Sequence, residues 1–222
     1  MPVMNGTRTS AVVAALLALL VGMPTARAED PDARGDKIAR CADLTAKAQS
    51  LLDAAEAEPD KERKVEAYKK CRDVAREAIA LDDTNADAHF VLFATEGRLQ
   101  LIKGAVPNPI SLYKVQGRLD HVLELDPQHP AGLAAKGGMY RQLPWALGGD
   151  LDKAEQYLKR AIERDPNSIG ARIELAATYR DMGRAERCDA LLEKAIAIAQ
   201  EQGKLHRIAE AEALRASLPS PR

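Results

Sequence analysis

One arrangement of small and apolar residues recurs along the chain. Each copy begins with a small or apolar residue. Further small or apolar residues follow four and seven positions later, and a helix-stopping or polar residue ends the copy. The copies begin at Cys71, Val115, Ala154 and Cys188. Spacings of four and three place these side chains on one face of a helix. Each copy therefore predicts a helix with a buried stripe, whose small members let a neighbouring helix approach closely.

A second kind of helix is predicted between these copies. The segments NADAHFVLFATEG, HPAGLAAKGGMY and SIGARIELAATYRDMG each follow a helix stop and carry an apolar stripe of their own. No stretch alternates apolar and polar residues for long enough to indicate a strand, so the fold class is all-α. The expected helical pairs lie at about 35–82, 86–126, 131–165 and 168–200, with a capping helix at 203–217. Recurring helical pairs predict a solenoid.

The intervals between copies shorten along the chain, from 44 to 39 to 34 residues. The longer intervals contain extra residues around GAVPNP (104–109) and LPWALGGD (143–150), where glycine and proline indicate loops. Asp150 follows two glycines and is a good helix N-cap. Insertions in a solenoid emerge on one edge, often the binding edge.

The small-residue and aromatic framework, seen in Leu175, Ala176 and Tyr179, resembles that of tetratricopeptide repeats. The resemblance implies a right-handed superhelix that binds a protein or peptide on its concave face. The stretch LPWALGGDLDKAEQYLKRAIERDPNS also resembles the T component of tripartite ATP-independent periplasmic transporters and the regulator-of-microtubule-dynamics repeat proteins. The first of these likenesses implies docking to a periplasmic solute-binding protein, or to another envelope protein.

The N-terminal residues are typical of a secretory signal. Residues 1–28 combine the positive Arg8, the apolar run at 11–22 and a small-x-small pattern ending at Ala28. Cleavage after Ala28 would leave residues 29–222 as the repeat domain, in the periplasm or secreted. The alternative is an uncleaved anchor, in which case this segment would attach the protein to the membrane.

Composition and motifs argue against several classes of function. The chain has 32 Lys and Arg against 33 Asp and Glu, so its net charge of −1 does not fit a basic nucleic-acid binder. Its four histidines lack metal-site spacing, and phosphate loops and nucleophile elbows are absent. We therefore expect no catalytic residue, metal or cofactor, and a protein that is not an enzyme.

The first helix of each pair supplies the candidate binding residues. The inward-facing set includes apolar side chains and an arginine at the same end of three successive units, and its members are Phe90, Arg98, Arg141, Ile173 and Arg180. Such arginines could seat a peptide or an anionic ligand by charge-assisted hydrogen bonds. Equally, they could be solvated at helix ends, near the last carbonyls. Trp145, in the second insertion, is expected either to pack as a lid on Tyr140 or to contact a ligand.

These features predict an exported, non-catalytic scaffold that binds a partner segment on its concave face. The alternative is an accessory component of a periplasmic transport system that binds a small apolar or anionic molecule, and a closed apolar cavity beneath Trp145 would favour it. An oxidising compartment would permit a Cys41–Cys71 disulfide. The other interpretation makes Cys71 and Cys188 small buried packing residues.

Overall fold

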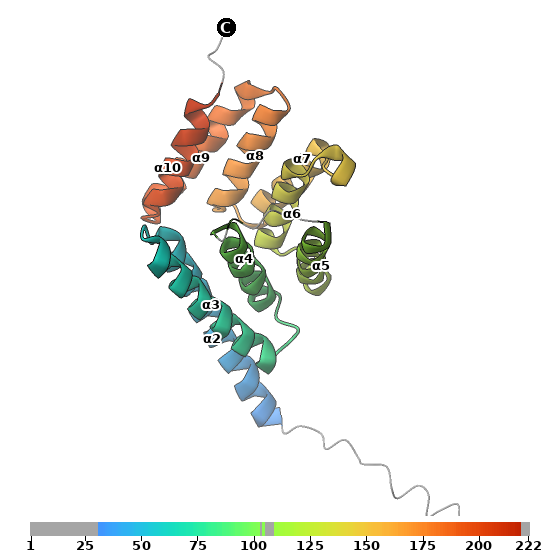
Figure 1. The fold of residues 1–222 in the computed structure, drawn as a ribbon, viewed down its shortest axis with the longest axis vertical. Coiled ribbons are helices and arrows are strands. Elements are labelled where there is room, and N and C mark those ends of the chain that lie inside the picture. Colours follow the sequence, from blue (N-terminus) through green and yellow to red (C-terminus); the bar gives the residue numbers. More distant parts are fainter. Residues whose placement is uncertain (1–30, 103, 105–108, 219–222) are drawn as a thin grey trace, which may run out of the picture. The chain divides into compact units, whose positions relative to one another are not determined.

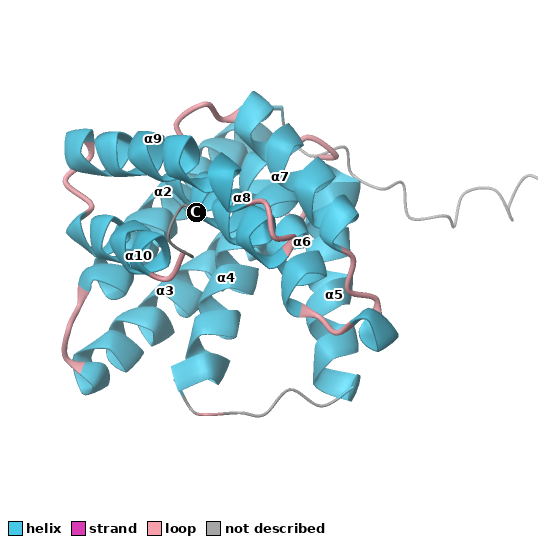
Figure 2. Ribbon diagram, turned by 90° about the horizontal axis from the view of Figure 1, so that it is seen from above, coloured by secondary structure: helices cyan, strands magenta, loops and turns pink. Residues whose placement is uncertain are grey.

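The computed structural model describes residues 31–102, 104 and 109–218. Over these residues it contains helices and connecting turns and no strand (Figures 1 and 2). The α-helices are α2 (Pro31–Ala57), α3 (Lys61–Leu81), α4 (Ala86–Ile102), α5 (Pro109–Leu125), α6 (Pro130–Gln142), α7 (Leu151–Arg164), α8 (Ile169–Asp181), α9 (Cys188–Glu201) and α10 (Leu205–Ala216). Two 3₁₀ turns, η1 (Trp145–Leu147) and η2 (Ala185–Arg187), precede α7 and α9. The expected all-α solenoid of helix pairs is confirmed.

The chain divides into two units, Met1–Asp36 and Lys37–Arg222. Of the first unit, the structure describes only residues 31–36, which begin α2. The expected signal segment, residues 1–28, lies outside the described residues. In the described part of the chain, no helix has the length and apolar character that crossing a membrane requires. All the contacts discussed below lie within the second unit.

The recurring stripe forms the contact between neighbouring helices. Its members on α7 are Ala154, Leu158 and Ala161, and all three are fully buried. The corresponding residues of α3 and α9 are equally buried, namely Cys71, Ala75, Ala78, Cys188, Leu192 and Ala195. Burial of a stripe of this width is the main source of stability for helices of this length. The local pattern therefore determined which face of each second helix packs inward.

The apolar core consists of a larger cluster, a smaller one and a three-residue group. The larger cluster is formed by the five helices from α6 through α10 and contains Leu133, Leu158 and Leu192. The smaller joins α2, α3 and α4 and contains Leu52 and Tyr68. The group Cys41, Ala78 and Ala88 also lies on α2, α3 and α4. Helix α5 lies between the two main clusters in the sequence, directly after the longer of the two expected insertions.

The cysteines are buried free thiols, so the possible Cys41–Cys71 disulfide is not formed. Cys71 Sγ points instead to the carbonyl oxygen of Ala48 and the hydroxyl of Thr95, both 3.1 Å away. Cys188 Sγ donates to the Ala176 carbonyl oxygen at 3.2 Å. Burial raises the pKa of the Cys71 and Cys188 thiols. Their role in this structure is the packing of adjacent helices.

Candidate functional site

The three candidate arginines are engaged by carboxylates of the same chain. Arg141, at the end of α6, donates to Glu174 Oε2 at 2.9 Å and to Asp181 Oδ2 at 3.1 Å, both on α8. Burial alone would lower the pKa of Arg141, but these two carboxylates outweigh it and raise the pKa. An incoming anion would have to displace both carboxylates. Arg141 therefore joins successive repeats.

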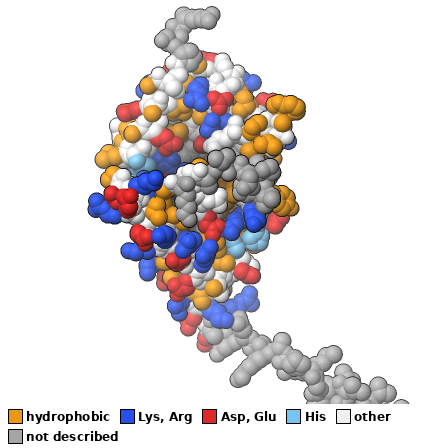
Figure 3. All heavy atoms as spheres, viewed as in Figure 1, with side chains coloured by type: hydrophobic (Ala, Val, Ile, Leu, Met, Phe, Trp, Pro, Cys, Tyr) orange, Lys and Arg blue, Asp and Glu red, His pale blue; other side chains and the backbone are white. Residues whose placement is uncertain are grey.

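The other two arginines are paired as well. Arg98 of α4 donates to Glu56 Oε1 of α2 at 3.1 Å. Arg180 of α8 donates to Asp181 Oδ1 at 2.9 Å and to Ser217 Oγ, just after α10, at 3.3 Å. The side chains of Arg98 and Arg180 are nevertheless 45% and 35% exposed, so an incoming anion would compete with these contacts. Figure 3 shows the same alternation of charge over one face, where cationic and acidic side chains are interspersed.

Glu56 holds together the first and last helices of the second unit. Its carboxylate accepts from Arg98 and also from Arg207 of α10, whose Nη2 lies 3.2 Å from Oε2. The Nε2 atom of His206 is 3.7 Å from the same oxygen and has no hydrogen-bond partner among the described residues. Burial would lower the pKa of Arg207, but Glu56 and Glu210 raise it. We call Glu56, Arg98, His206 and Arg207 the Glu56 cluster.

The remaining candidates lie in different surroundings. Ile173 is 4% exposed and belongs to the larger core cluster, so it does not form the floor of an open groove. Phe90 is half-buried, and its ring packs on that of His129 at 5.1 Å. Trp145 is 88% exposed, so the expected lid on Tyr140 is wrong. Tyr140 stacks on Tyr157 instead, with 5.5 Å between ring centroids.

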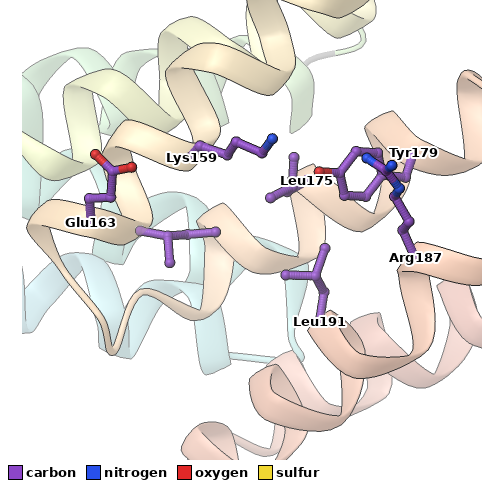
Figure 4. A pocket seen from close by; sticks show the side chains of 7 residues that line it. Lys159, Glu163, Leu175, Tyr179, Arg187 and Leu191 are labelled. Carbon is purple, nitrogen blue, oxygen red and sulfur yellow. The ribbon is translucent and has the colours of Figure 1, made fainter.

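An open apolar groove does exist, but between α7 and α9 (Figure 4). Its volume is about 480 Å³. Its lining residues come from four elements. They are Lys159, Ile162 and Glu163 of α7, Leu175 and Tyr179 of α8, Arg187 of η2 and Leu191 of α9. We call this surface the α8 groove. Because helix positions two residues apart point about 200° from each other, Leu175 and Tyr179 face away from Ile173 and Ala177.

Charged side chains surround the apolar floor of the α8 groove. Glu155 Oε1 accepts from Lys159 Nζ at 2.5 Å and from the Tyr179 hydroxyl at 3.1 Å. The hydrogen bond from Lys159 is the main reason that the pKa of Glu155 is lowered, and the same bond raises the pKa of Lys159. The Arg187 guanidinium lies over the Tyr179 ring, 5.4 Å from its centroid. The groove thus combines an apolar floor with a rim that carries both cationic and acidic side chains.

This arrangement can bind an apolar or amphipathic segment, which is how helical grooves recognise peptides. The described residues contain no group of His, Cys, Asp and Glu that could hold a metal ion. A second cavity, of about 100 Å³, lies between α4 and α5 near Phe93 and Arg118. Trp145 lines neither of these two cavities. Neither is therefore the closed apolar cavity beneath Trp145 that would favour the binding of a small molecule.

Sequence reasoning missed the α8 groove because its residues come from four elements and carry no motif. Leu191 lies beside the buried stripe of α9, not within it. Leu175 belongs to the apolar framework of its own helix, so the pattern predicts a buried residue there. A signal was nevertheless present, since Ile162 widens the apolar stripe of α7 on one flank and Leu191 widens that of α9 on the opposite flank. A wider stripe than a neighbouring helix can cover leaves apolar surface exposed.

Comparison with known proteins gives one family match and several similar structures. Residues 147–218 match the tetratricopeptide repeat family. The chain is similar to TTC0263, a thermophilic tetratricopeptide repeat protein in Thermus thermophilus, with 19% identity over 76% of this chain and 88% of that one and a TM-score of 0.47. It is also similar to MamA, with 17% identity over 77% and 96% of the two chains and a TM-score of 0.42. No curated protein matches.

The family match extends from η1 through α10, and it includes the interval in which the copies are 34 residues apart. The buried stripe of α9 recurs on α7, within the match, and on α3, which lies N-terminal to it. Residues 147–218 of the chain therefore match the tetratricopeptide repeat family.

Proposed function

We propose that this protein is an exported, non-catalytic scaffold that binds a partner polypeptide in the α8 groove. The observation that supports the proposal is the apolar floor of this groove, formed by Ile162, Leu175 and Leu191 and left open between α7 and α9. The face on which Arg98, Arg141 and Arg180 lie is a weaker candidate, because its arginines are already paired with Glu56, Glu174 and Asp181.

The chemistry of the groove favours an amphipathic segment that places its apolar face on the floor. Ile162, Leu175 and Leu191 would receive apolar side chains, and burial of their surface would drive association. Lys159 and Arg187 are each about half exposed on the rim, where they contact Glu155 and Glu186 of the same chain, so carboxylates of the partner would compete with these contacts. Pairs of this kind contribute more to orientation and association rate than to affinity.

Site-specific photo-crosslinking tests the location of the partner. A photoreactive amino acid at Glu163, on the rim of the groove, is expected to give discrete covalent adducts in cells of the source organism. Arg164 is also exposed on α7 but does not line the groove, so the same substitution there is the matched control. Adducts from position 163 that are absent from position 164 support the proposal. No adduct at position 163, or the same adducts at both positions, would contradict it.

Export is the second element of the proposal, and the amino-acid pattern of residues 1–28 supports it. N-terminal sequencing of the protein recovered from cells and from the medium tests it directly. A mature N-terminus at Glu29 is the expected result. An intact N-terminus on protein found only in the cytoplasmic fraction would overturn export and leave the binding proposal unaffected.

A further inference from the structure

The function proposed above leaves several exposed apolar side chains of the described residues unexplained, and two of them, including the most exposed, lie together on η1. Trp145 is 88% exposed and Leu147 is 51% exposed. We call these two residues the Trp145 knob. Large apolar side chains on the surface are costly in water and, when held in a fixed position, often mark a contact with another protein.

The turn that carries the knob is closed by backbone hydrogen bonds. Gly149 N–H donates to the Pro144 carbonyl oxygen at 3.0 Å, and Asp150 N–H donates to the Tyr140 carbonyl oxygen at 2.9 Å. A Cβ atom at Gly149 would lie 1.8 Å from the Leu143 carbonyl oxygen, so only glycine allows this closure. Because the turn is already ordered, docking the knob would cost little conformational entropy.

The knob and the α8 groove are complementary in chemistry. The knob is apolar, and the floor of the groove is formed by Ile162, Leu175 and Leu191. The exposed Asp152 follows the knob at the start of α7, and the groove rim carries two cations, Lys159 and Arg187, against one carboxylate, Glu163. The guanidinium of Arg187 also offers a cation to an indole ring, which is the aromatic group that binds cations best.

We propose that the α8 groove of one copy of this chain receives the Trp145 knob of a second copy. The inference rests on the proposed binding function of the groove and names its occupant. The high exposure of Trp145 shows that the knob does not occupy the groove of its own chain. Because knob and groove are different surfaces, the contact is head-to-tail, and every added copy leaves one free knob and one free groove.

Such a contact is small, so the association is weak and concentration-dependent. One indole and one leucine side chain bury only a fraction of the area of a standard interface. We expect self-association to develop between about 10 μM and about 1 mM, which is the range of weak contacts. Sedimentation velocity across this range is expected to show a weight-average mass that rises without reaching a dimer plateau.

Trp145 is the only tryptophan of the chain, so its fluorescence reports on the knob alone. Entry into an apolar groove is expected to shift its emission to the blue and to reduce quenching by iodide as the protein concentration rises. Trp145→Ala is expected to weaken association about tenfold or more, as loss of a central aromatic anchor does. Tyr113→Ala is the matched control, because Tyr113 is 77% exposed and lies on α5, outside both surfaces.

Mixing two defective variants gives the decisive test. Leu191→Lys keeps the knob and loses the groove, whereas Trp145→Ala keeps the groove and has no tryptophan. Each alone is expected to associate at least about tenfold more weakly than the wild type, and the mixture is expected to form a dimer that cannot grow. Any blue shift in the mixture comes from Trp145 of the Leu191→Lys chain. Since Leu191 packs partly against the core, Arg187→Glu on the exposed rim is a second groove variant, and circular dichroism checks that both variants fold.

Three results would overturn the inference: a wild-type chain that stays monomeric up to about 1 mM, a Trp145→Ala variant that associates like the wild type, or a variant mixture without a blue shift. If the chain is monomeric while Glu163 still crosslinks to a different protein, the occupant is wrong and the proposed function stands. If position 163 gives no adduct with any protein, the proposed function fails as well.

Discussion

The side chain of His129 joins α6 to α4, because its Nε2 atom lies 3.0 Å from Oδ1 of Asp87. The other ring nitrogen, Nδ1, accepts the backbone N–H of Gly132 at 2.9 Å and so caps α6. A ring that accepts at Nδ1 donates at Nε2, so the two contacts require one tautomer. This buried side chain therefore bridges helices that belong to different core clusters.

Two substitutions at His129 separate the cap from the bridge. His129→Ala removes both and is expected to lower the free energy of unfolding by about 1–2 kcal/mol. His129→Asn keeps a good N-cap residue but is too short to reach Asp87, so it is expected to recover part of this loss. Urea unfolding measures both variants. Equal losses for the two variants would mean that the cap contributes nothing.

The bond to Asp87 also predicts a dependence on pH. The hydrogen bond from His129 lowers the pKa of Asp87 below its ordinary value of 3.8, although burial acts in the opposite direction. A lowered pKa contributes stability that is present above the ordinary value and is lost as pH falls through the lowered one. The wild type is therefore expected to exceed Asp87→Ala in stability at pH 6 by a modest amount, since the carboxylate is largely exposed.

Unfolding free energies measured from pH 6 down to about pH 2.5 check this, because the difference should shrink only below about pH 4. Glu163→Ala is the control for removing a carboxylate, since Glu163 is exposed and makes no ion pair with the described residues. A gap for Asp87→Ala that widens on acidification would contradict the assignment.

The Glu56 cluster predicts that the stability of α10 depends on its ion pair with Glu56 of α2. Glu56 is 16% exposed and accepts from both Arg98 and Arg207. Glu56→Gln removes the negative charge that Arg98 and Arg207 share. We therefore expect the free energy of unfolding to fall by about 1–3 kcal/mol. Glu210→Gln is the matched control, because Glu210 pairs with Arg207 alone and is 45% exposed.

Hydrogen exchange locates the effect of Glu56→Gln. Faster exchange in α10 (Leu205–Ala216) is expected for Glu56→Gln and not for Glu210→Gln. Added salt should reduce the difference in stability between wild type and Glu56→Gln, since ions screen partly exposed pairs. An α10 that exchanges at the wild-type rate would show that packing alone holds it.

Two adjacent glycines of α6 are expected to respond differently to alanine. A Cβ atom at Gly137 would lie 2.5 Å from Leu158 Cγ, whereas one at Gly138 would lie 3.4 Å from the flexible Glu174 carboxylate. Gly137→Ala is therefore expected to cost about 1–3 kcal/mol through overpacking. Gly138→Ala is expected to be neutral or to stabilise by up to about 1 kcal/mol, because alanine favours the helix. Thermal unfolding of the pair measures this contrast.

The thiols provide a check on the absence of a disulfide. Cys41, Cys71 and Cys188 are buried and free, so a thiol reagent such as DTNB is expected to react with none of them in the folded protein. After denaturation without reductant, it should detect three thiols. Detection of a single thiol would indicate a bridge between two of the cysteines.

Features that depend on neighbouring residues could be predicted from the sequence. The stripe Ala154, Leu158 and Ala161 is buried as its spacing indicated, and Asp150 caps α7 by accepting from Lys153 N–H at 2.9 Å. Both follow from helix geometry within a few residues. The prediction that Trp145 packs as a lid on Tyr140 was wrong. The path of the 143–149 turn depends on backbone hydrogen bonds that the sequence pattern does not reveal.

By itself, the sequence determined the helices, the face that each second helix buries and the all-α solenoid class, because spacings of three and four act within one helix. Only the tertiary structure decided which charges meet and which apolar surface stays open. Glu56 and Arg207 are 151 residues apart, and Arg141 and Glu174 are 33 apart. Whether such side chains pair depends on how successive helix pairs rotate against one another, and that rotation is the sum of many small packing contacts.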